Sequence, residues 1–261
     1  MKIKSLGFIG AGRVTKIILT GLKKKSKLPG HIFVSDVNSE RLNRLKNEFP
    51  EIDISLNNNS IPAEKDIVFL ALHPPAISSV LLEISPFLKS TKFLISLAPK
   101  VSIKNIQENL EFLPKIVRMI PNACSIVNIG YNPVTFDNTV NEKDKKFLLN
   151  FLSDLGECPV VPEEKLEAYA VITGMGPTYF WFQFNELKEI AKNFGLTEQE
   201  SVKAIAGMGI GMIKTLFNSN LTEEQVMDLI PVKPLAEQEE RIKETFRSAL
   251  IPLYKKLKGI A

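Results

Sequence analysis

Two kinds of segment alternate through about the first 120 residues of this chain, and their order restricts its fold. Short apolar runs rich in β-branched residues predict buried strands, and the stretches between them have the spacing of amphipathic helices. Repeated strand, helix, strand units of this length predict a doubly wound parallel sheet with helices on both faces, an α/β fold. The expected strands are residues 3–9, 32–36, 67–72, 93–96 and 116–119, and the expected helices are residues 15–22, 39–49, 76–84 and 103–110.

The alternation stops after about residue 162, and the remaining sequence is helical in pattern. We therefore expect two domains, residues 1–162 and residues 163–261. One long helical pattern, residues 164–194, is interrupted at Gly174 and at Gly176-Pro177. A helical half of roughly 100 residues can form a core alone, but it equally suits packing against a second subunit.

The later helices are marked by their ends and by their faces. Capping boxes are expected to open two of them. Two glycines on one face of the middle helix would let another backbone approach closely. A stripe of apolar residues predicts a packed face on the last helix. These features are Thr197 with Glu200 and Thr222 with Gln225, then Gly207 and Gly211, then Phe246, Leu250, Leu253 and Leu257.

Composition excludes several classes of function. The formal charge of +4 is spread over single lysines and short pairs without aromatic interleaving, which argues against nucleic-acid binding. The apolar N-terminus is cut by glycines well short of the roughly 20 residues of a membrane span, and we expect no signal peptide or membrane helix. Cys124 and Cys158 lack paired spacing, so neither a disulfide framework nor a metal site is expected. A reducing cytoplasm is the expected compartment.

The stretch GFIGAGRVTKIILTGL fits a phosphate-binding turn between a strand and a helix. Such a turn needs a first glycine for the bend, a second for close approach to a pyrophosphate, and a small third residue for helix packing. Gly10, Gly12 and Thr15 occupy these places, although Thr15 is larger than the usual Gly or Ala. A purely structural corner is the alternative, but the strand before the turn, the helix after it and a later acid favour dinucleotide binding.

That acid is Asp36, at the end of the second expected strand. A carboxylate there can accept hydrogen bonds from the ribose hydroxyls and would repel a 2′-phosphate. NAD(H) is therefore favoured, and NADP(H) stays possible because nearby Arg13 and Arg41 could offset the charge of the acid.

Several stretches together resemble pyrroline-5-carboxylate reductase over almost the full length of the chain. Besides the glycine turn, they are DIVFLALHPPAI, FLISLAPKVSI, KIVRMIPNACSIVNIG and TGMGPTYFWFQFNELKEIAKNFGL, in the order of that family. The resemblance implies an N-terminal Rossmann domain and a C-terminal all-helical dimerisation domain that interlocks with its partner in a homodimer or higher oligomer. It also implies hydride transfer from a reduced nicotinamide to the C=N carbon of a cyclic imine carrying a carboxylate.

The resemblance assigns site residues in three groups. Asn122 and Thr178 are the expected catalytic residues, although Asn122 equally suits an Asx turn after proline. Substrate contacts are expected from Met175, Gly176, Pro177, Tyr179 and Lys233, where Tyr179 has a core aromatic as its alternative. Cofactor contacts are expected from Gly10, Ala11, Gly12, Arg13, Val14, Asp36, Ala71, Leu72, His73, Pro74 and Ala98.

The departures from the family lie mainly at the substrate end. The family's S-G-S-G-P-A-Y is here TGMGPTY, so the thioether of Met175 replaces a hydroxyl. The S-P-G-G-T-T loop, which holds the substrate carboxylate in the family, is missing, and IPVKPLAE stands at residues 230–237. A site without those donors should bind the usual carboxylate poorly, because a buried anion needs partners. Lys233 offers a replacement charge or is an exposed lysine between two prolines.

Two further features have plain alternatives. His73 follows a strand, on the rim where open α/β sheets bind ligands, whereas His31 is expected at the surface. The aromatic run Phe180, Trp181, Phe182 and Phe184 predicts a buried helix or a subunit contact more than a substrate cage.

Three functions remain open from the sequence. The first is an NAD(P)H-dependent imine reductase of the pyrroline-5-carboxylate reductase type acting on a small molecule, as in proline biosynthesis. Its substrate is either that of the family or a different cyclic imine. The second is a Rossmann oxidoreductase acting on a C=O or C–OH group, against which stands the lack of a Lys or His placed as acid or base. The third is a nucleotide-binding dimer without turnover.

Overall fold

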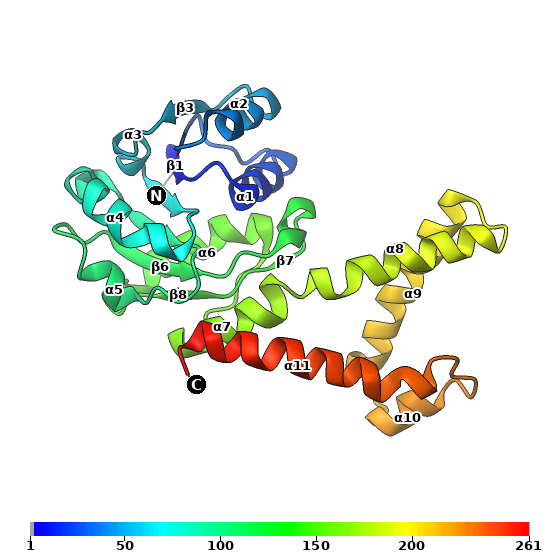
Figure 1. Cartoon of the computed structure of the whole chain (residues 1–261). Helices are drawn as coiled ribbons and strands as arrows, with labels where there is room; N and C mark the ends of the chain where they lie inside the picture. Colours follow the sequence, from blue (N-terminus) through cyan, green and yellow to red (C-terminus); the bar gives the residue numbers. More distant parts are fainter. Residues whose placement is uncertain (1–2, 261) are drawn as a thin grey trace. The chain divides into compact units, whose positions relative to one another are not determined.

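The computed structural model describes residues 3–260 and separates into two compact units. The first unit extends through Met175 and includes the end of the chain from Leu253, and the second is Gly176–Pro252. Figure 1 shows the sheet with its helices and the group of long helices that form these units. Each unit is considered by itself below.

A seven-stranded sheet forms the centre of the first unit. Its strands are β1 (Ser5–Ile9), β2 (His31–Asp36), β3 (Asp53–Leu56), β4 (Ile67–Leu70), β5 (Phe93–Ser96), β6 (Lys115–Met119) and β8 (Val134–Phe136). Their order is β3-β2-β1-β4-β5-β6-β8, with all pairs parallel except β6 and β8. This is the order of a doubly wound Rossmann sheet, so the predicted fold class is confirmed. A separate small sheet pairs β7 (Gly130–Tyr131) with β9 (Gly156–Glu157).

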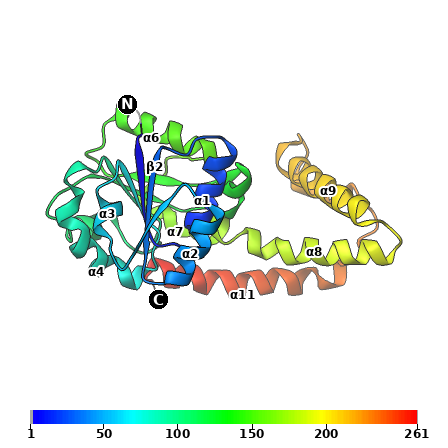
Figure 2. The ribbon, with the colours of Figure 1, turned by 90° about the horizontal axis from the view of Figure 1, so that it is seen from above.

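Helices cover both faces of this sheet. Figure 2 shows α3 and α4 on one side of the strands and α1 and α2 on the other. Two apolar clusters result, one containing Leu6, Phe8 and Leu19, the other Val68, Leu81 and Leu94. The helices are α1 (Arg13–Lys24), α2 (Ser39–Glu48), α3 (Ser60–Ala63), α4 (Pro74–Ile84), α5 (Ile103–Gln107), α6 (Glu142–Leu152) and α7 (Leu166–Tyr169), with 3-10 turns at Ser85–Ser90, Ala123–Val127, Ser153–Leu155 and Glu163–Lys165.

The expected elements are found, with shifted ends and several omissions. The predicted strand at residues 67–72 ends at Leu70, because the chain leaves the sheet there towards Pro74 at the start of α4. The predicted helix at residues 103–110 ends at Gln107. Sequence analysis missed β3 and β8, the short edge strands of the large sheet, and both strands of the small sheet. It also missed the short helix α3 and helix α6, whose charged sequence hides its apolar stripe.

The predicted helical pattern over residues 164–194 is interrupted where the sequence indicated, between Gly174 and Pro177, and its first part holds a π-helical segment that the sequence did not reveal. After α7 the chain forms a π-helical segment, Ala170–Gly174, and α8 (Pro177–Asn193) begins afresh at Pro177. Residues 163–175 lie in the first unit, where Leu166 and Ala170 pack on Ile120. The boundary between the two compact units thus lies after Met175, later than residue 162. The predicted boundary between functional domains stays a prediction.

Long helices make up the second unit. They are α8, α9 (Glu198–Asn218), α10 (Glu223–Asp228) and the part of α11 (Glu239–Lys258) up to Pro252, with a 3-10 turn at Ala236–Gln238. Both predicted capping boxes are confirmed, at Thr197 with Glu200 and at Thr222 with Gln225. Among the described residues of the chain, no helix has the length and apolar character needed to cross a membrane.

Candidate functional site

The carboxyl ends of the parallel strands collect most of the predicted cofactor residues at one edge of the first unit. In this sheet the strand order reverses at β1, which lies between β2 and β4, and ligands of open α/β sheets bind beside such a reversal. Residues 10–14 follow β1, Asp36 ends β2, residues 71–74 follow β4, and Ala98 follows β5. The topology therefore brings these residues to one edge.

Gly10 and Gly12 serve the turn after β1 in different ways. Gly10 has φ +110°, and a Cβ there would lie 2.4 Å from the Ala71 carbonyl oxygen. Only glycine fits that position, which is held by an N–H donated to the Ser35 carbonyl at 2.7 Å. Gly12 has an ordinary φ of −82°, and a Cβ on it would meet no atom within 4 Å. The space beside Gly12 is what close approach of a pyrophosphate requires.

Thr15 explains why a larger third residue is tolerated in this turn. Its side chain is fully buried, and its hydroxyl donates a 2.5 Å hydrogen bond to the Gly10 carbonyl. The hydroxyl thus closes the turn from the side of the helix. Helix α1 itself begins without a side-chain cap and without an acid in its first turn. Its first N–H groups have no intrahelical acceptor, which favours an anion at this end.

Asp36 has a second role that the sequence did not reveal. Its Oδ2 accepts the Ala11 N–H at 2.7 Å, and its Oδ1 accepts the Asn38 N–H at 2.8 Å. The carboxylate therefore fixes the glycine turn to β2, while each oxygen keeps a lone pair for a hydroxyl. Arg13 and Arg41, the proposed offsetting charges, are both exposed.

The neighbouring rim residues are placed by the ends of β4 and β5. His73 is exposed and is the N-cap residue of α4, whose first residue is Pro74. Ala71 and Leu72 are half-buried beside it, and Ala98 is buried after β5. His31 is exposed, as predicted.

Asn122 is held by the fold on three sides. Its side-chain oxygen accepts the Cys124 N–H at 2.9 Å, its amide nitrogen donates to the Thr173 carbonyl at 2.6 Å, and its backbone N–H donates to Asn132 at 2.8 Å. The contact with Cys124 is the Asx turn of the alternative interpretation. A catalytic role for Asn122 stays a prediction, and one amide hydrogen remains for it.

The predicted substrate residues lie in two places. Met175 follows the π-helical segment of the first unit, with its N–H donated to the Ala170 carbonyl, and Gly176 to Tyr179 open the second unit. Tyr179 packs edge-on against Phe246, with ring centroids 6.0 Å apart, and burial raises the pKa of its hydroxyl. Thr178 is exposed in the first turn of α8, and Lys233 is exposed in the segment between α10 and α11.

A buried ion cluster near the same edge was missed by sequence analysis. Arg118 of β6 is 3% exposed, and its guanidinium contacts Glu163 at 2.9 Å and Glu167 at 2.8 Å. The signal was present, because an arginine inside an apolar strand needs buried partners. Glu163 and Glu167, four residues apart at the start of the helical sequence, were the candidate partners.

Neither cysteine is in a disulfide. Burial raises the pKa of the Cys158 thiol to about 12, and burial also raises the pKa of the Cys124 thiol. Both side chains are therefore poor nucleophiles at neutral pH.

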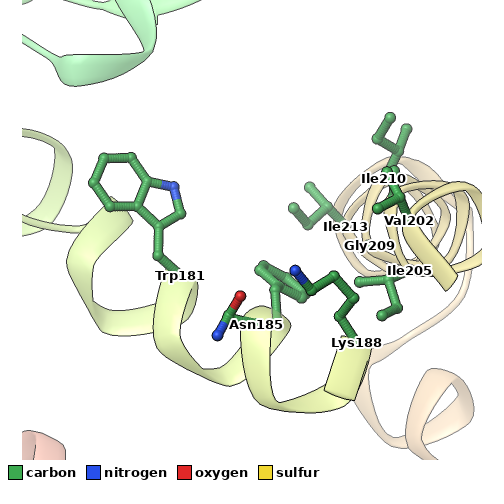
Figure 3. Close-up of a pocket in the computed structure, with 10 residues that line it drawn as sticks. Trp181, Asn185, Lys188, Val202, Ile205, Gly209, Ile210 and Ile213 are labelled. Carbon is green, nitrogen blue, oxygen red and sulfur yellow. The ribbon is translucent and has the colours of Figure 1, made fainter. Parts of the chain in front are cut away.

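The second unit contains an apolar hollow of about 580 Å³ between α8 and α9. Figure 3 shows side chains that line it, with Trp181, Asn185 and Lys188 on α8 and Ile205, Ile210 and Ile213 on α9. Lys188 is ion-paired with Glu189 and Glu198, and its side chain keeps contact with solvent. The lining offers packing surface and no group suited to reaction chemistry.

Comparisons with known proteins agree with this geometry. The family described as NADP oxidoreductase coenzyme F420-dependent matches residues 5–100, from β1 through the loop after β5. Pyrroline-5-carboxylate reductase of Escherichia coli (strain K12) is 27% identical over 228 residues, 87% of this chain and 84% of that protein. The enzyme of the same name from Methanosarcina acetivorans is 26% identical, over 88% and 85%.

Solved structures extend the similarity to nearly the whole chain. Plasmodium falciparum pyrroline carboxylate reductase with NADP bound has a TM-score of 0.82 at 24% identity, covering 99% of this chain and 98% of that one. A pyrroline-5-carboxylate reductase from Coxiella burnetii has a TM-score of 0.69 at 26% identity, covering 99% and 96%. Sequence and fold thus confirm the resemblance that the motifs indicated, and this chain is similar to pyrroline-5-carboxylate reductases over most of its length.

Proposed function

We propose that this protein is an NAD(P)H-dependent oxidoreductase that reduces the C=N bond of a cyclic imine. The observation that carries the proposal is the glycine turn at the reversal of strand order, in a chain similar to pyrroline-5-carboxylate reductases over most of its length. Of the three functions left open by the sequence, this one has the support of the named relatives. The missing S-P-G-G-T-T loop is the one feature that favours a nucleotide-binding dimer without turnover.

The residues at the sheet edge fit a dinucleotide. The open space at Gly12 and the uncapped start of α1 suit a pyrophosphate, and Asp36 suits a ribose with free hydroxyls. Ala71 to Pro74 and Ala98 extend the same edge towards the place expected for the nicotinamide. The reduced nicotinamide supplies a hydride when it is bound. Both NADH and NADPH are compatible with this site, and preference for NADH stays our prediction.

The protein's own part in such a reaction is mainly orientation. A protonated imine is already electrophilic, so holding it near the hydride donor in a dry site supplies much of the rate. We propose Asn122 and Thr178 as the polar contacts, with Met175, Gly176, Pro177 and Tyr179 around the substrate. Lys233 remains a proposal for a replacement of the missing carboxylate-binding loop, and its exposure leaves the charge available.

We further propose that the second unit is covered by a second copy of this chain. Helices α8 and α10 bury no residue, and α9 buries only Ser201 and Gly209. Large apolar side chains remain open to water there, among them Trp181 at 53%, Phe182 at 67% and Phe217 at 75% exposure. An exposed apolar surface of this extent is typical of an obligate interface. A Cβ added to Gly207 or to Gly211 would meet no other atom within 4 Å, which leaves room for a partner backbone.

The two cysteines bear on the compartment in which the protein works. The free thiols Cys124 and Cys158 suit a reducing compartment, and we propose the cytoplasm.

The test is turnover of defined substrates by the purified protein. NADH and NADPH oxidation is followed by absorbance with a panel of cyclic imines, pyrroline-5-carboxylate included, and with 2-oxo acids. We expect turnover with an imine and none with oxo acids. Gly12→Val is the matched control, because a Cβ at this position meets no atom of the fold within 4 Å and the branched side chain occupies the pyrophosphate space, and it should abolish turnover while the protein stays folded. Turnover of oxo acids alone, or cofactor binding with no imine reduced, would contradict the proposal.

A further inference from the structure

Arg118 is a buried charge that the proposed chemistry does not use. It lies near the carboxyl end of β6, between Ser96 of β5 and Thr135 of β8, and is 3% exposed. Moving a guanidinium from water into a protein interior is costly, and apolar residues in its place are often as stable or more so. Arg118 also has a buried Nε without a hydrogen-bond partner among the described residues. Stability alone is a weak explanation for such a side chain.

The two carboxylates that bind Arg118 also hold the loop after β5. Glu167 Oε1 accepts the Lys100 N–H at 3.3 Å, and Glu163 Oε1 accepts the Ile103 N–H at 2.7 Å. Lys100 has φ +73°, a left-handed conformation that costs a non-glycine residue about 1 kcal/mol. The loop therefore needs external bonds to keep this shape, and it contains Ala98, one of the proposed cofactor contacts.

The same carboxylates hold the segment that leads to the proposed substrate residues. Glu167 lies in α7, which continues directly into the π-helical segment Ala170–Gly174. That segment is tied to the β6 side a second time by the 2.6 Å bond from Asn122 to the Thr173 carbonyl. A Cβ on Gly174 would lie 3.1 Å from the Ile120 side chain, so the fit there is already close. Arg118 and Asn122, four residues apart, thus fix one helix at two points.

We propose that Arg118 is a positioning residue for the reaction. Through Glu163 and Glu167 it sets the loop after β5 and the helix before Met175 against the Asn122 turn. The inference rests on the proposed function, because it concerns the edge that would receive the nicotinamide and the substrate. It adds a determinant of geometry that touches neither ligand.

A second ion pair on the same strand provides a matched control. Lys115, at the start of β6, contacts Asp144 of α6 at 2.7 Å, and Asp144 is 7% exposed. This pair lies at the amino end of the strand, opposite to the proposed site. A purely structural role would give both pairs the same consequences when removed.

The experiment compares the double variant Arg118→Met/Glu167→Gln with Lys115→Met/Asp144→Asn. Each removes a buried ion together with its buried partner, and the charges left without that partner in the first variant, Glu163 and Lys258, are 33% and 27% exposed. We expect the first to fold, to bind NADH with a Kd within about threefold of the wild type, and to lose about 10- to 100-fold in kcat, since small misplacements have that effect. The second should retain kcat within about twofold even where its Tm falls. Arg118→Lys should be intermediate, because an ammonium cannot bridge both carboxylates.

Hydrogen exchange supplies a readout that needs no turnover. Backbone amides of residues 97–103 and 166–174 should exchange faster in Arg118→Met/Glu167→Gln and at the wild-type rate in the control variant. Equal losses of kcat in both double variants, or unchanged exchange in these segments, would overturn the positioning role. A wild-type protein that binds NADH but reduces no imine would instead refute the proposed function, and the exchange result would still decide the role of Arg118.

Discussion

The two units of this chain treat their apolar side chains in opposite ways. In the sheet unit, Leu6, Phe8 and Leu19 have no exposed surface, and helices close both faces of the sheet. In the helical unit, Phe182 and Phe217 have most of their surface open to water. The sheet unit thus completes its own core, whereas the helical unit has an exposed apolar surface of the kind that binds another chain. We infer that cofactor binding is a property of one unit and that assembly is a property of the other.

The largest expected effect follows from charging the helical surface. In the double variant Ile210→Glu/Ile213→Glu, two carboxylates replace side chains that are 59% and 53% exposed on one face of α9. A desolvated charge at an interface costs about 2–5 kcal/mol, so we expect dissociation to monomers, measured by light scattering after gel filtration. NADH binding should persist because the glycine turn lies in the sheet unit. Leu82→Glu, a change at a 63% exposed position of α4, is the control and should leave the assembly intact. A wild-type protein that is already monomeric would refute the distinction.

The second effect separates folding from binding inside the glycine turn. Gly10→Ala places a methyl group 2.4 Å from the Ala71 carbonyl at φ +110°, so we expect it to destabilise the sheet unit by about 3 kcal/mol or more. Gly12→Ala should change stability by less than about 1 kcal/mol, because its backbone is ordinary and its surroundings are open. The latter should still weaken NADH binding. Urea denaturation and calorimetric titration measure the two quantities, and equal stability losses would show that our distinction is wrong.

A smaller effect tests the two roles of Asp36. In Asp36→Asn the single side-chain oxygen can still accept the Ala11 N–H, whereas the charge and the bond from the Asn38 N–H are lost. We expect the Kd of NADH to rise about tenfold, the loss of a charged hydrogen bond, and the Kd of NADPH to fall. Asp36→Ala also removes the bond to Ala11 and should weaken both cofactors. An unchanged NADH affinity in both variants would exclude the ribose role.

The sequence predicted this edge because its parts are local. Gly10, Gly12 and Asp36 lie next to strands that are strongly apolar, and the order of strands and helices was sufficient to place them together. The hydroxyl bond of Thr15 to Gly10 was not predicted, because it depends on the exact path of the turn. The same holds for the bond from Asp36 to Ala11, which joins residues from two strands.

The rest of the site depends on contacts between distant segments. Arg118 meets Glu163 and Glu167 only because the chain returns across the carboxyl edge of the sheet after β9. The break of the long helical pattern was visible at Gly174 and Pro177, but a π-helical segment between them has no simple sequence pattern. Periodicity also could not show whether Phe182 is covered by this chain, since an interface and a core have the same apolar pattern.

The smallest expected effect is the change in stability when an ion pair is removed, and it should differ between the two units. The hydrogen bond from the Lys115 ammonium lowers the pKa of Asp144 below its ordinary value of 3.8. The stabilisation is therefore fully present above about pH 5 and is lost as the pH falls through the lowered native pKa. Asp144→Asn should cost about 1–2 kcal/mol at pH 7, and this difference from wild type should shrink towards pH 3 in thermal unfolding.

Glu198 provides the comparison in the helical unit. Its carboxylate pairs with Lys188 and Lys192, which lower its pKa, but the Glu198 side chain is 57% exposed, Lys192 is 40% exposed and Lys188 is half-buried. Because solvent and salt screen exposed pairs, Glu198→Gln should leave Tm unchanged at pH 7 and at pH 3. A loss of stability in Glu198→Gln as large as in Asp144→Asn would mean that α8 and α9 are more enclosed in solution than in a single chain. That result would itself point to the partner surface. Repeating the measurement in Ile210→Glu/Ile213→Glu would show whether a partner chain encloses the ion pair, because the loss of stability should then disappear once the assembly is broken.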